Sequence, residues 1–402
     1  MTIQFDAQRQ SILKGVRVLD ISRLLAGNIT SMLLGDFGAG VTKVEPPTGD
    51  PLRDWKHNDA SLQWKTYGRN KRSIVLDIHA AGARKVLLAL LAKYDVLIEN
   101  FRPGTLENLG LAPSVLHEAN PGLIIARISG FGQTGPYAQR PGFGTLVEAM
   151  SGLASQNGFA DREPVLPPLG FADKITGVYG AMAVSMALIA RNTSGGKGQV
   201  IDLSLLESII SLLGAEATIY AASGHLNERC GSGSNTTAPR NVYRCSDGRF
   251  VALSGSIQAM AQRVFIAIGK PEMNADPRFA TNAARVRNRS LVDEAVGHWF
   301  AQRTREEALA AMEASDVTVA PVNDIADVVA DPHVREREIL VDVEDAQLGN
   351  ITLYNILPRF SDTPGVWRRP APELGQHTDQ ILAEAGYDDA TIATLRREGA
   401  AA

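Results

Sequence analysis

The sequence predicts an α/β protein whose main domain contains a parallel sheet covered by helices on both faces. Through the first 130 residues, short apolar segments alternate with segments of helical character. The short segments are apolar almost without interruption, which is typical of strands buried on both faces. A change to Gly- and Ser-rich composition near residue 226 indicates a boundary to a second, smaller domain, and 402 residues suffice for two or three domains.

The first half of the chain is expected to follow a regular strand–helix order. Gly38 and Gly40 end the first helix, and Pro46 closes the second strand. A Gly- and Pro-rich segment, 129–152, is predicted to be a long loop, and such loops are usually functional. Strands are expected at 16–21, 41–45, 73–78, 95–100 and 123–128, and helices at 29–37, 80–94 and 112–120.

The second half centres on a long apolar helix predicted at 169–191. Because it is apolar nearly all round, we expect it to be buried in protein. Its length is near the lower limit for a membrane span, but Gly177 and Gly180 favour a packed core helix. Further expected elements are a strand at 200–205, a helix at 206–222, a hairpin at 241–254, helices to 314, a short extended piece at 319–322, strands within 340–364 and a helical tail at 376–397.

Composition excludes several classes of partner and places the protein in the cytoplasm. The formal charge of −4 gives no broad attraction to nucleic acid. Two cysteines do not make a disulfide framework, so a reducing compartment is expected. The first 15 residues contain no apolar signal core. We therefore expect a cytoplasmic protein with neither a membrane nor a nucleic acid as partner.

The common cofactor motifs are missing from this sequence. The turn after the first strand, 22–28, lacks the glycine spacing that lets backbone approach a pyrophosphate, so a nicotinamide cofactor is rejected. There is also no phosphate-binding loop, paired-cysteine metal motif or serine elbow. We expect no metal and no permanently bound cofactor.

Asp173 allows two interpretations because it lies where the central helix begins. It could be an N-cap that accepts backbone N–H bonds. It could also be a carboxylate nucleophile kept ionised by the positive end of the helix. Two other positions stay open in the same way: the cluster at 70–72 is either solvated charge or a phosphate contact, and His377 is a surface or cap residue.

Several stretches together resemble the family III coenzyme A transferases, or CaiB/BaiF family, which includes formyl-CoA, carnitine-CoA and succinyl-CoA transferases. The resemblance runs from about Gly15 to Tyr387. It rests on LLGDFGAGVTKVEPPTGDPLR (33–53), GRNKRSIVLDI (68–78), ENFRPGTLENLGL (99–111), ISGFGQTGPYAQRPGF (128–143), the segment around Asp173, KGQVIDLSLLES (197–208) and PAPELGQHTDQIL (370–382).

The resemblance implies an interlocked homodimer with a discontinuous large domain. That domain has a Rossmann-like parallel sheet and is built from both chain ends, with a smaller α+β domain inserted. We accordingly expect residues 1–225 to form the first part of the large CoA-binding domain, 226–330 the small domain, and 331–402 the part that returns to the large domain.

The resemblance also implies the site residues. Asp173 matches the nucleophile that attacks an acyl-CoA donor, so that CoA passes to a small carboxylic acid through an acyl-aspartyl intermediate. Gly231, Ser232 and Gly233 are assigned to a substrate-binding loop. Contacts with CoA are implied for Leu25, Ala26, Lys71, Arg72, Leu76, His79, Asn100, Phe101, Arg102 and Arg140.

One departure from the family pattern lies in the loop before the nucleophile. Many members have an aromatic residue followed by an acid where this chain has Phe143 and Gly144. The related α-methylacyl-CoA racemases place a His-Asp pair there, and Phe143 cannot transfer a proton. The local sequence resembles the branch that acts on C4 and C5 dicarboxylates. A 2-methylacyl-CoA racemase and a non-catalytic CoA-binding protein are the alternatives to a transferase.

Overall fold

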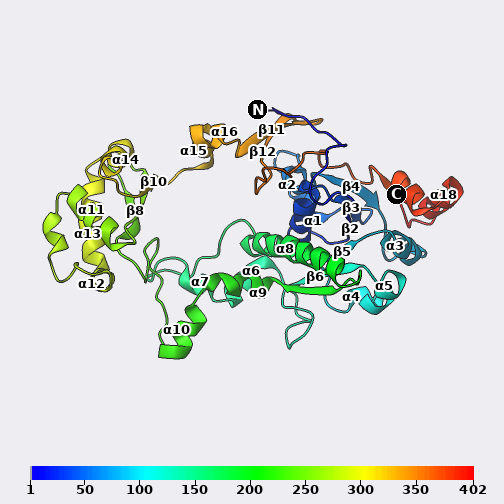
Figure 1. Cartoon of the computed structure of the whole chain (residues 1–402), viewed down its shortest axis with the longest axis horizontal. Helices are drawn as coiled ribbons and strands as arrows, with labels where there is room; N and C mark the ends of the chain where they lie inside the picture. The colour runs from blue at the N-terminus through cyan, green and yellow to red at the C-terminus, as the bar shows by residue number, and fades with distance from the viewer. Residues whose placement is uncertain (1) are drawn as a thin grey trace. The chain divides into compact units, whose positions relative to one another are not determined.

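The computed structural model describes residues 2–402, which separate into two compact units (Figure 1). Unit 1 comprises the chain up to Leu153, Pro167–Gly214 and Glu338–Ala402. Unit 2 comprises Ala154–Leu166 and Ala215–Arg337. The observed boundaries at 214 and 337 replace the expected 225 and 330, and the segment 154–166 belongs to unit 2 although the sequence assigned it to the large domain.

Unit 1 contains a six-stranded sheet in the order β4-β3-β2-β5-β6-β7, and all of its strands are parallel. Its strands are β2 (Arg17–Asp20), β3 (Gly40–Glu45), β4 (Lys71–Val75), β5 (Val96–Glu99), β6 (Ile124–Ser129) and β7 (Val200–Ser204). This confirms the predicted α/β class, and the expected strands match within a few residues.

Side chains alternate between the two faces of this sheet, as the pleat of a strand requires. On β2, Val18 packs into one hydrophobic core and Leu19 into the other. On β5, Leu97 faces the core that contains Leu19, and Val96 and Ile98 face the opposite one. Both faces are therefore buried, which explains why the strands read as continuous apolar runs.

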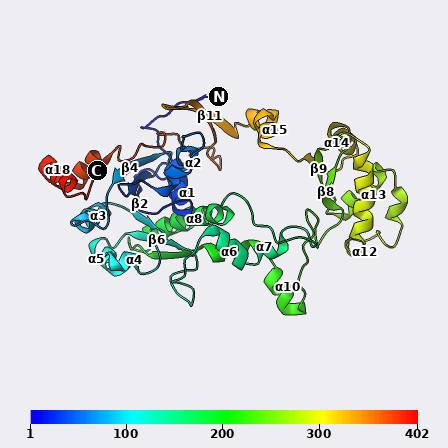
Figure 2. The ribbon, with the colours of Figure 1, turned by 180° about the vertical axis from the view of Figure 1, so that it is seen from behind.

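Helices α1 (Ala26–Asp36) and α8 (Phe171–Thr193) cover one face of the sheet and pack closely together (Figure 2). A Cβ atom on Gly177 would lie 2.6 Å from Ile29, and one on Gly180 would lie 2.4 Å from the Thr30 hydroxyl. The Thr30 hydroxyl also donates to the Gly177 carbonyl over 3.2 Å. These two glycines thus bring the helix backbones together. The two helices run in the same direction, since Gly177 contacts Ile29 and Gly180 contacts Thr30.

The expectation that this central helix is buried all round is wrong for the single chain. Its inner face is buried, but Val178, Met182, Met186 and Ile189 form an exposed stripe, and Ile189 is 67% exposed. These four residues are spaced at helical intervals, so they lie on one side of α8. We call them the α8 stripe.

The opposite face of the sheet is covered by α3 (Ala83–Leu91), α5 (Pro113–Ala119), α17 (Thr378–Ala385) and α18 (Asp389–Arg397). The C-terminal segment therefore returns to unit 1 as helices on this core. It adds no strand to the six-stranded sheet, all of whose strands lie within residues 17–204. It contributes β11 (Leu340–Asp345) and β12 (Gly349–Tyr354), which form a separate sheet with β1 (Thr2–Ile3).

Further short helices complete unit 1, and one of them shows that the prediction of a loop over the whole of 129–152 is wrong. Helix α6 (Gly144–Met150) lies inside that segment, so only its first part is irregular. The predicted helix at 206–222 is interrupted near residue 214, and residues 355–364 contain no strand. The others are η1 (Pro51–Asp54), α2 (Leu62–Tyr67), α4 (Thr105–Asn108), α7 (Leu153–Gln156, at the unit boundary), α9 (Leu205–Ile210) and η2 (Ser211–Leu213).

Unit 2 has its own hydrophobic core around the antiparallel sheet β10-β9-β8. Tyr243 on β8 stacks on Phe300 with ring centroids 5.3 Å apart. The predicted hairpin is confirmed. The elements are α10 (Glu216–Ser223), β8 (Arg240–Arg244), β9 (Phe250–Ser254), α11 (Gln258–Ala267), η3 (Pro271–Asn274), α12 (Asn282–Arg287), α13 (Arg289–Ala301), α14 (Arg305–Ala314), β10 (Val319–Pro321), α15 (Ile325–Ala330) and α16 (Pro332–Glu336).

Within residues 2–402, no single helix combines the length and hydropathy of a membrane span. Two consecutive helical segments separated by a bend, Leu205–Leu213 and Glu216–Ser223, have this length and hydropathy only when they are counted together.

Candidate active site

A cavity of about 400 Å³ opens at the carboxyl edge of the six-stranded sheet, where the strand order reverses between β2 and β5. In open α/β sheets this position is the usual ligand crevice. Residues following β2, β5 and β6 line it, together with the start of α8. Its charged side chains are Arg23, Arg102, Arg140 and Asp173, so three guanidinium groups share a cavity with one carboxylate.

Asp173 is the third residue of α8, and the N-cap position belongs to Gly170. The interpretation of Asp173 as a simple N-cap is therefore wrong. Ala26, the first residue of α1, lines the same cavity, so two helices begin beside it. Helix N-termini carry a partial positive charge and free N–H groups. The carboxylate thus lies where backbone donors gather.

Two residues of α6 define the immediate surroundings of the Asp173 carboxylate. A Cβ atom on Gly144 would lie 2.5 Å from the Asp173 Oδ2 atom, so the missing side chain leaves room for the carboxylate. Glu148 is buried, and its Oε1 atom accepts the Ala172 N–H over 2.8 Å. Glu148, rather than Asp173, therefore satisfies a first-turn N–H group of α8.

Burial, with a smaller contribution from the negative charge of Glu148, raises the pKa of Asp173 to about 6, while a hydrogen bond from its own backbone opposes the shift. A carboxylate with this pKa is mostly ionised at neutral pH. Its higher basicity makes it a better nucleophile than an ordinary solvated aspartate.

Close backbone contacts hold the loops around the cavity. Asn100 bridges the loops after β2 and β5, because its Oδ1 atom accepts the Arg23 N–H over 2.8 Å and its Nδ2 atom donates to the Arg23 carbonyl over 2.7 Å. A Cβ atom on Gly130 or on Gly142 would lie 2.7 Å from the other residue's backbone. The segment before α6 can therefore lie directly against the end of β6.

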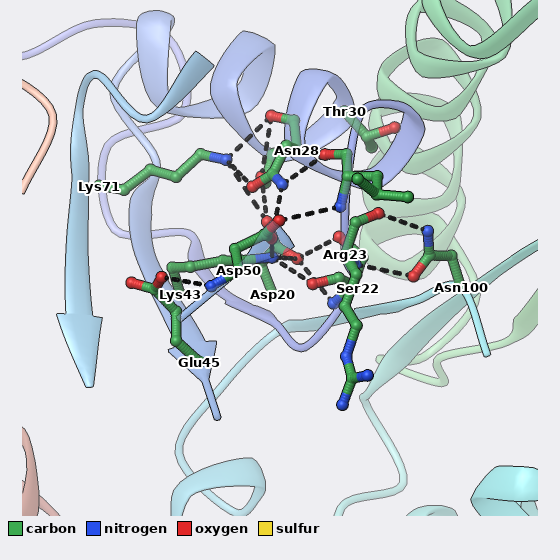
Figure 3. Close-up of polar contacts among 12 residues, drawn as sticks. Asp20, Ser22, Arg23, Asn28, Thr30, Lys43, Glu45, Asp50, Lys71 and Asn100 are labelled. Atoms are coloured by element: carbon green, nitrogen blue, oxygen red, sulfur yellow. Dashed lines mark hydrogen bonds and ion pairs between the residues drawn. The ribbon is translucent and has the colours of Figure 1, made fainter. Parts of the chain in front are cut away.

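A buried ionic network lies beneath this edge of the sheet (Figure 3). Lys43 pairs with Asp20 at 3.3 Å and with Asp50 at 3.0 Å, and Lys71 donates to the Asn28 carbonyl and side-chain oxygens at 2.9 and 2.8 Å. Asp50 also accepts the N–H of Leu24, a residue with a φ of +62° that lines the cavity. The network thus fixes an unusual backbone conformation at the cavity wall.

Burial and the nearby Lys43 charge together lower the pKa of Lys71 to about 8, against the opposing charges of Asp20 and Asp50. Burial alone would raise the pKa of Asp20, but the ammonium groups of Lys43 and Lys71 hold it below its ordinary value. The network is balanced by opposite charges, as buried ions require.

The structure brings together about half of the residues assigned to CoA. Ala26, Asn100, Phe101, Arg102 and Arg140 line the Asp173 cavity, and Leu25 is buried beside it, next to Gly170. The remaining four residues lie elsewhere in unit 1, and the loop assigned to substrate binding lies in unit 2. These are Lys71, Arg72, Leu76 and His79, and Gly231, Ser232 and Gly233.

Each of these four residues outside the cavity has a definite environment. Lys71 is fully buried and would have to leave three protein oxygens to reach a ligand. Arg72 pairs with Glu384 at 2.7 Å. Leu76 is buried and bridges to Ala401, and His79 is exposed with its N–H on Asp77. Their assignments to CoA stay predictions.

Sequence reasoning missed Arg23 and Glu148. Arg23 lies in the turn that was tested only for a dinucleotide motif, and its guanidinium is 5.8 Å from the Phe101 ring centre. Glu148 follows Gly144 by one helical turn, and an acid among the apolar positions of this segment was an available signal. No group of three or more metal-ligating residues was found within residues 2–402, and both cysteines are free.

Comparison with known proteins decides the family. Residues 13–378 match the sequence model of CoA-transferase family III. The chain belongs to this family. A succinyl-CoA–D-citramalate CoA-transferase of Chloroflexus aurantiacus is 37% identical over 96% of both chains. A human succinyl-CoA:glutarate CoA-transferase is 34% identical over 98% of this chain and 91% of its own.

A solved structure supports the same assignment. A CaiB/BaiF family protein from Brucella suis superposes with a TM-score of 0.83 and 34% identity, covering 94% of this chain and all of that one. As a family III CoA-transferase, the protein is an enzyme that uses CoA thioesters as substrates. The alternative of a non-catalytic CoA-binding protein is therefore set aside.

Proposed function

We propose that this CoA-transferase moves CoA from succinyl-CoA to a C4 or C5 dicarboxylic acid, with Asp173 as the covalent nucleophile. The observation that carries the proposal is the Asp173 carboxylate at the start of α8, the only carboxylate lining a cavity that also contains Arg23, Arg102 and Arg140. Anions are expected to gather where three guanidinium groups and two helix N-termini meet.

The geometry fits a mechanism of successive acyl transfers. An Asp173 oxygen attacks the thioester carbon, the carbon–sulfur bond breaks, and CoA thiolate leaves an acyl-aspartyl anhydride. The thiolate attacks the aspartyl carbon, which releases the donor acid and forms an aspartyl-CoA thioester. The acceptor carboxylate attacks the same aspartyl carbon, which expels the thiolate and forms a second anhydride between Asp173 and the acceptor. The thiolate then attacks the acceptor acyl carbon, which forms the product thioester and releases the Asp173 carboxylate.

Each step passes through a tetrahedral oxyanion that needs hydrogen-bond donors. Free N–H groups at the starts of α1 and α8 are suited to this role because they are fixed before the reaction. No general base is required, since the attacking carboxylate is already ionised above its pKa of about 6.

The dicarboxylate assignment rests on the named relatives and on charge. Relatives at 33–40% identity are named for citramalate, malate and glutarate transfer. An acceptor with two carboxylates needs a cationic partner for the end that does not react. Arg23 suits this role because it is half-buried on the cavity wall beside Phe101, whereas Arg102 and Arg140 are exposed. Arginine forks bind carboxylates through two parallel hydrogen bonds.

The decisive experiment compares the wild-type protein with Asp173→Asn. We expect Asp173→Asn to fold and to lose turnover by orders of magnitude, because it lacks the attacking anion. Succinyl-CoA and hydroxylamine are added to each protein, and the peptide around Asp173 is weighed after digestion. A hydroxamate on Asp173 is expected in the wild-type protein alone.

A matched control is Asp202→Asn, which alters a carboxylate that accepts the Gln133 N–H outside the cavity. It should keep the hydroxamate on Asp173. An unmodified Asp173 peptide together with normal turnover by Asp173→Asn would contradict the proposal. Solvent deuterium entering the α-carbon of a 2-methylacyl-CoA would instead support the racemase alternative.

A further inference from the structure

A second cavity of about 360 Å³ lies at the amino edge of the six-stranded sheet, the edge opposite to Asp173. The first residues of β2 and β3 line it, together with Asn70 and Arg72 at the start of β4, the end of α3, the segment after Val366 and one side of α17. None of its lining residues belongs to the Asp173 cavity. It therefore needs an explanation of its own.

The charges of this second cavity are strongly one-sided, although the chain as a whole is acidic. Five cationic side chains line it, but only one carboxylate, Glu384, does. Glu384 is already paired with Arg72 at 2.7 Å. The cations are Arg17, Arg72, Lys93, Arg368 and Arg369.

Two of the guanidinium groups have unused donors. The Arg369 side chain makes no hydrogen bond or ion pair within residues 2–402, although the residue is only partly exposed. The Nε–H of Arg368 is buried without an acceptor, while its Nη1 atom donates to the Gly38 carbonyl over 3.1 Å. Buried donors without acceptors cost free energy, so an anion would stabilise this arrangement.

The folded backbone holds these groups in place. Asn70, whose φ is +62°, accepts the Arg368 N–H over 2.7 Å and donates its own backbone N–H to the Arg369 carbonyl over 3.0 Å. His377 accepts the Ser73 N–H at Nδ1 over 3.3 Å, which places its proton on Nε2. The cavity is thus built by residues more than 290 positions apart in sequence.

The electrostatics agree with an excess of positive charge. Burial and the charges of Arg369 and Arg72 lower the pKa of His377 to about 4. Burial and the neighbouring Arg368 and Arg72 charges also lower the pKa of Arg369. Burial is the larger cause in both residues, the neighbouring guanidinium charges add to it, and the Glu384 carboxylate opposes both shifts.

We propose that this second cavity binds a small phosphorylated anion, either a phosphate ester or a diphosphate. A phosphoryl group offers three oxygens and about two negative charges, which several arginine forks can share, whereas a single carboxylate offers two oxygens. Leu90, Val41 and Ile381 supply apolar wall for an organic group. The site is separate from the transfer chemistry, so its test does not depend on the proposed function.

The test is calorimetric titration of the full-length protein without CoA, which is itself a phosphate ester and a diphosphate, and variants at the two cavities assign the binding to one of them. The probes are inorganic pyrophosphate, adenosine 5′-diphosphate and succinate. We expect pyrophosphate or adenosine diphosphate to bind, more weakly at high salt. Binding of adenosine diphosphate would identify an organic phosphate, and binding of pyrophosphate alone an inorganic one. Tighter binding of succinate that is weakened in Arg369→Gln, and therefore occurs in this second cavity, would overturn the proposal.

The variants locate the binding. Arg369→Gln and, independently, Lys93→Gln should weaken phosphate binding, the first by about tenfold as expected for a lost charge-assisted bond. Arg140→Ala, at the other cavity, should change it by less than about twofold, because it removes the same charge at the opposite edge. No binding to the wild-type protein, or unchanged binding to both Gln variants, would contradict the proposal.

Discussion

At the scale of single residues, the nucleophilic role proposed for Asp173 depends on two neighbours that carry no obvious motif. Gly144 leaves space for the carboxylate, and Glu148 adds negative charge while holding the Ala172 N–H. Gly144 and Glu148, four positions apart on α6, thus give the proposed nucleophile both room and basicity. The departure from the family pattern at Phe143 and Gly144 has a physical consequence here, because an acid at position 144 would need the volume that Asp173 occupies.

Glu148→Gln provides a test of this coupling through the pH profile. The nucleophile must be ionised. We therefore expect kcat/KM to be at its full value above the Asp173 pKa of about 6 and to fall as the pH falls through that pKa. The glutamine still accepts the Ala172 N–H but removes the charge. We expect the acidic limb to move to lower pH by up to about one unit, since burial still acts on Asp173.

The control for this pH shift is Glu118→Gln, an exposed charge on α5 at the other face of the sheet. Its profile should match that of the wild-type protein. An acidic limb that stays in place, or moves to higher pH, in Glu148→Gln would show that Glu148 does not raise the Asp173 pKa.

At the scale of elements, loops at the carboxyl edge supply the cationic groups and helix ends supply the backbone donors. Strands β2, β5 and β6 end together because the sheet is parallel, so segments far apart in sequence meet at one cavity. The contact between α1 and α8 aligns their N-termini there. It depends on Gly177 and Gly180, whose missing side chains allow the close approach.

Arg140→Ala tests the loop before α6 as a contact for the CoA donor. Arg140 is exposed, and its guanidinium lies 3.8 Å from the Tyr137 ring centre, so its removal should not disturb the core. We expect KM for succinyl-CoA to rise by about tenfold with little change in kcat, because the contact is the same in ground and transition states.

Arg102→Ala should act in the same direction as Arg140→Ala, and Arg397→Ala, on the exposed surface of α18, should have no effect. Steady-state kinetics with varied succinyl-CoA measure all three variants. Unchanged kinetics in both Arg102→Ala and Arg140→Ala would remove these side chains from the CoA site.

At the scale of the whole molecule, the α8 stripe is an apolar surface left exposed in the single chain. Val178, Met182, Met186 and Ile189 form this surface on α8, whose other side is packed in unit 1, and the family resemblance implies an interlocked homodimer. We therefore propose that the α8 stripe is buried in a homodimer. Light scattering at micromolar concentration should give about twice the 43.1 kDa mass of one chain.

The variant Ile189→Glu should reduce this mass or weaken association, because it places a charge in the proposed interface. Ile12→Glu is a matched control, since Ile12 is 59% exposed on another part of unit 1. A wild-type monomer, or a dimer unaffected by Ile189→Glu and by the double variant with Met186→Glu, would contradict this assignment.

The sequence by itself determined the order of strands and helices along the chain and the position of Asp173 at the start of a helix. Short continuous apolar runs and helices at period 3.6 are local signals, so β2 to β7, α3 and the β8–β9 hairpin could be located to within a few residues. The family resemblance was equally local, since it rested on contiguous stretches of the chain. These signals sufficed for the α/β class, the family and the candidate nucleophile.

Only the tertiary structure decided which predicted residues share a site. Arg72 and Arg102 both read as phosphate contacts, yet they lie at opposite edges of one sheet, because strand direction and crossovers set which end of a strand each occupies. Lys71, next to Arg72, turns into the interior because side chains alternate along a strand. The partners of Lys71, the Glu148 contact and the Arg368–Arg369 cluster all join residues distant in sequence, and no local pattern encodes such contacts.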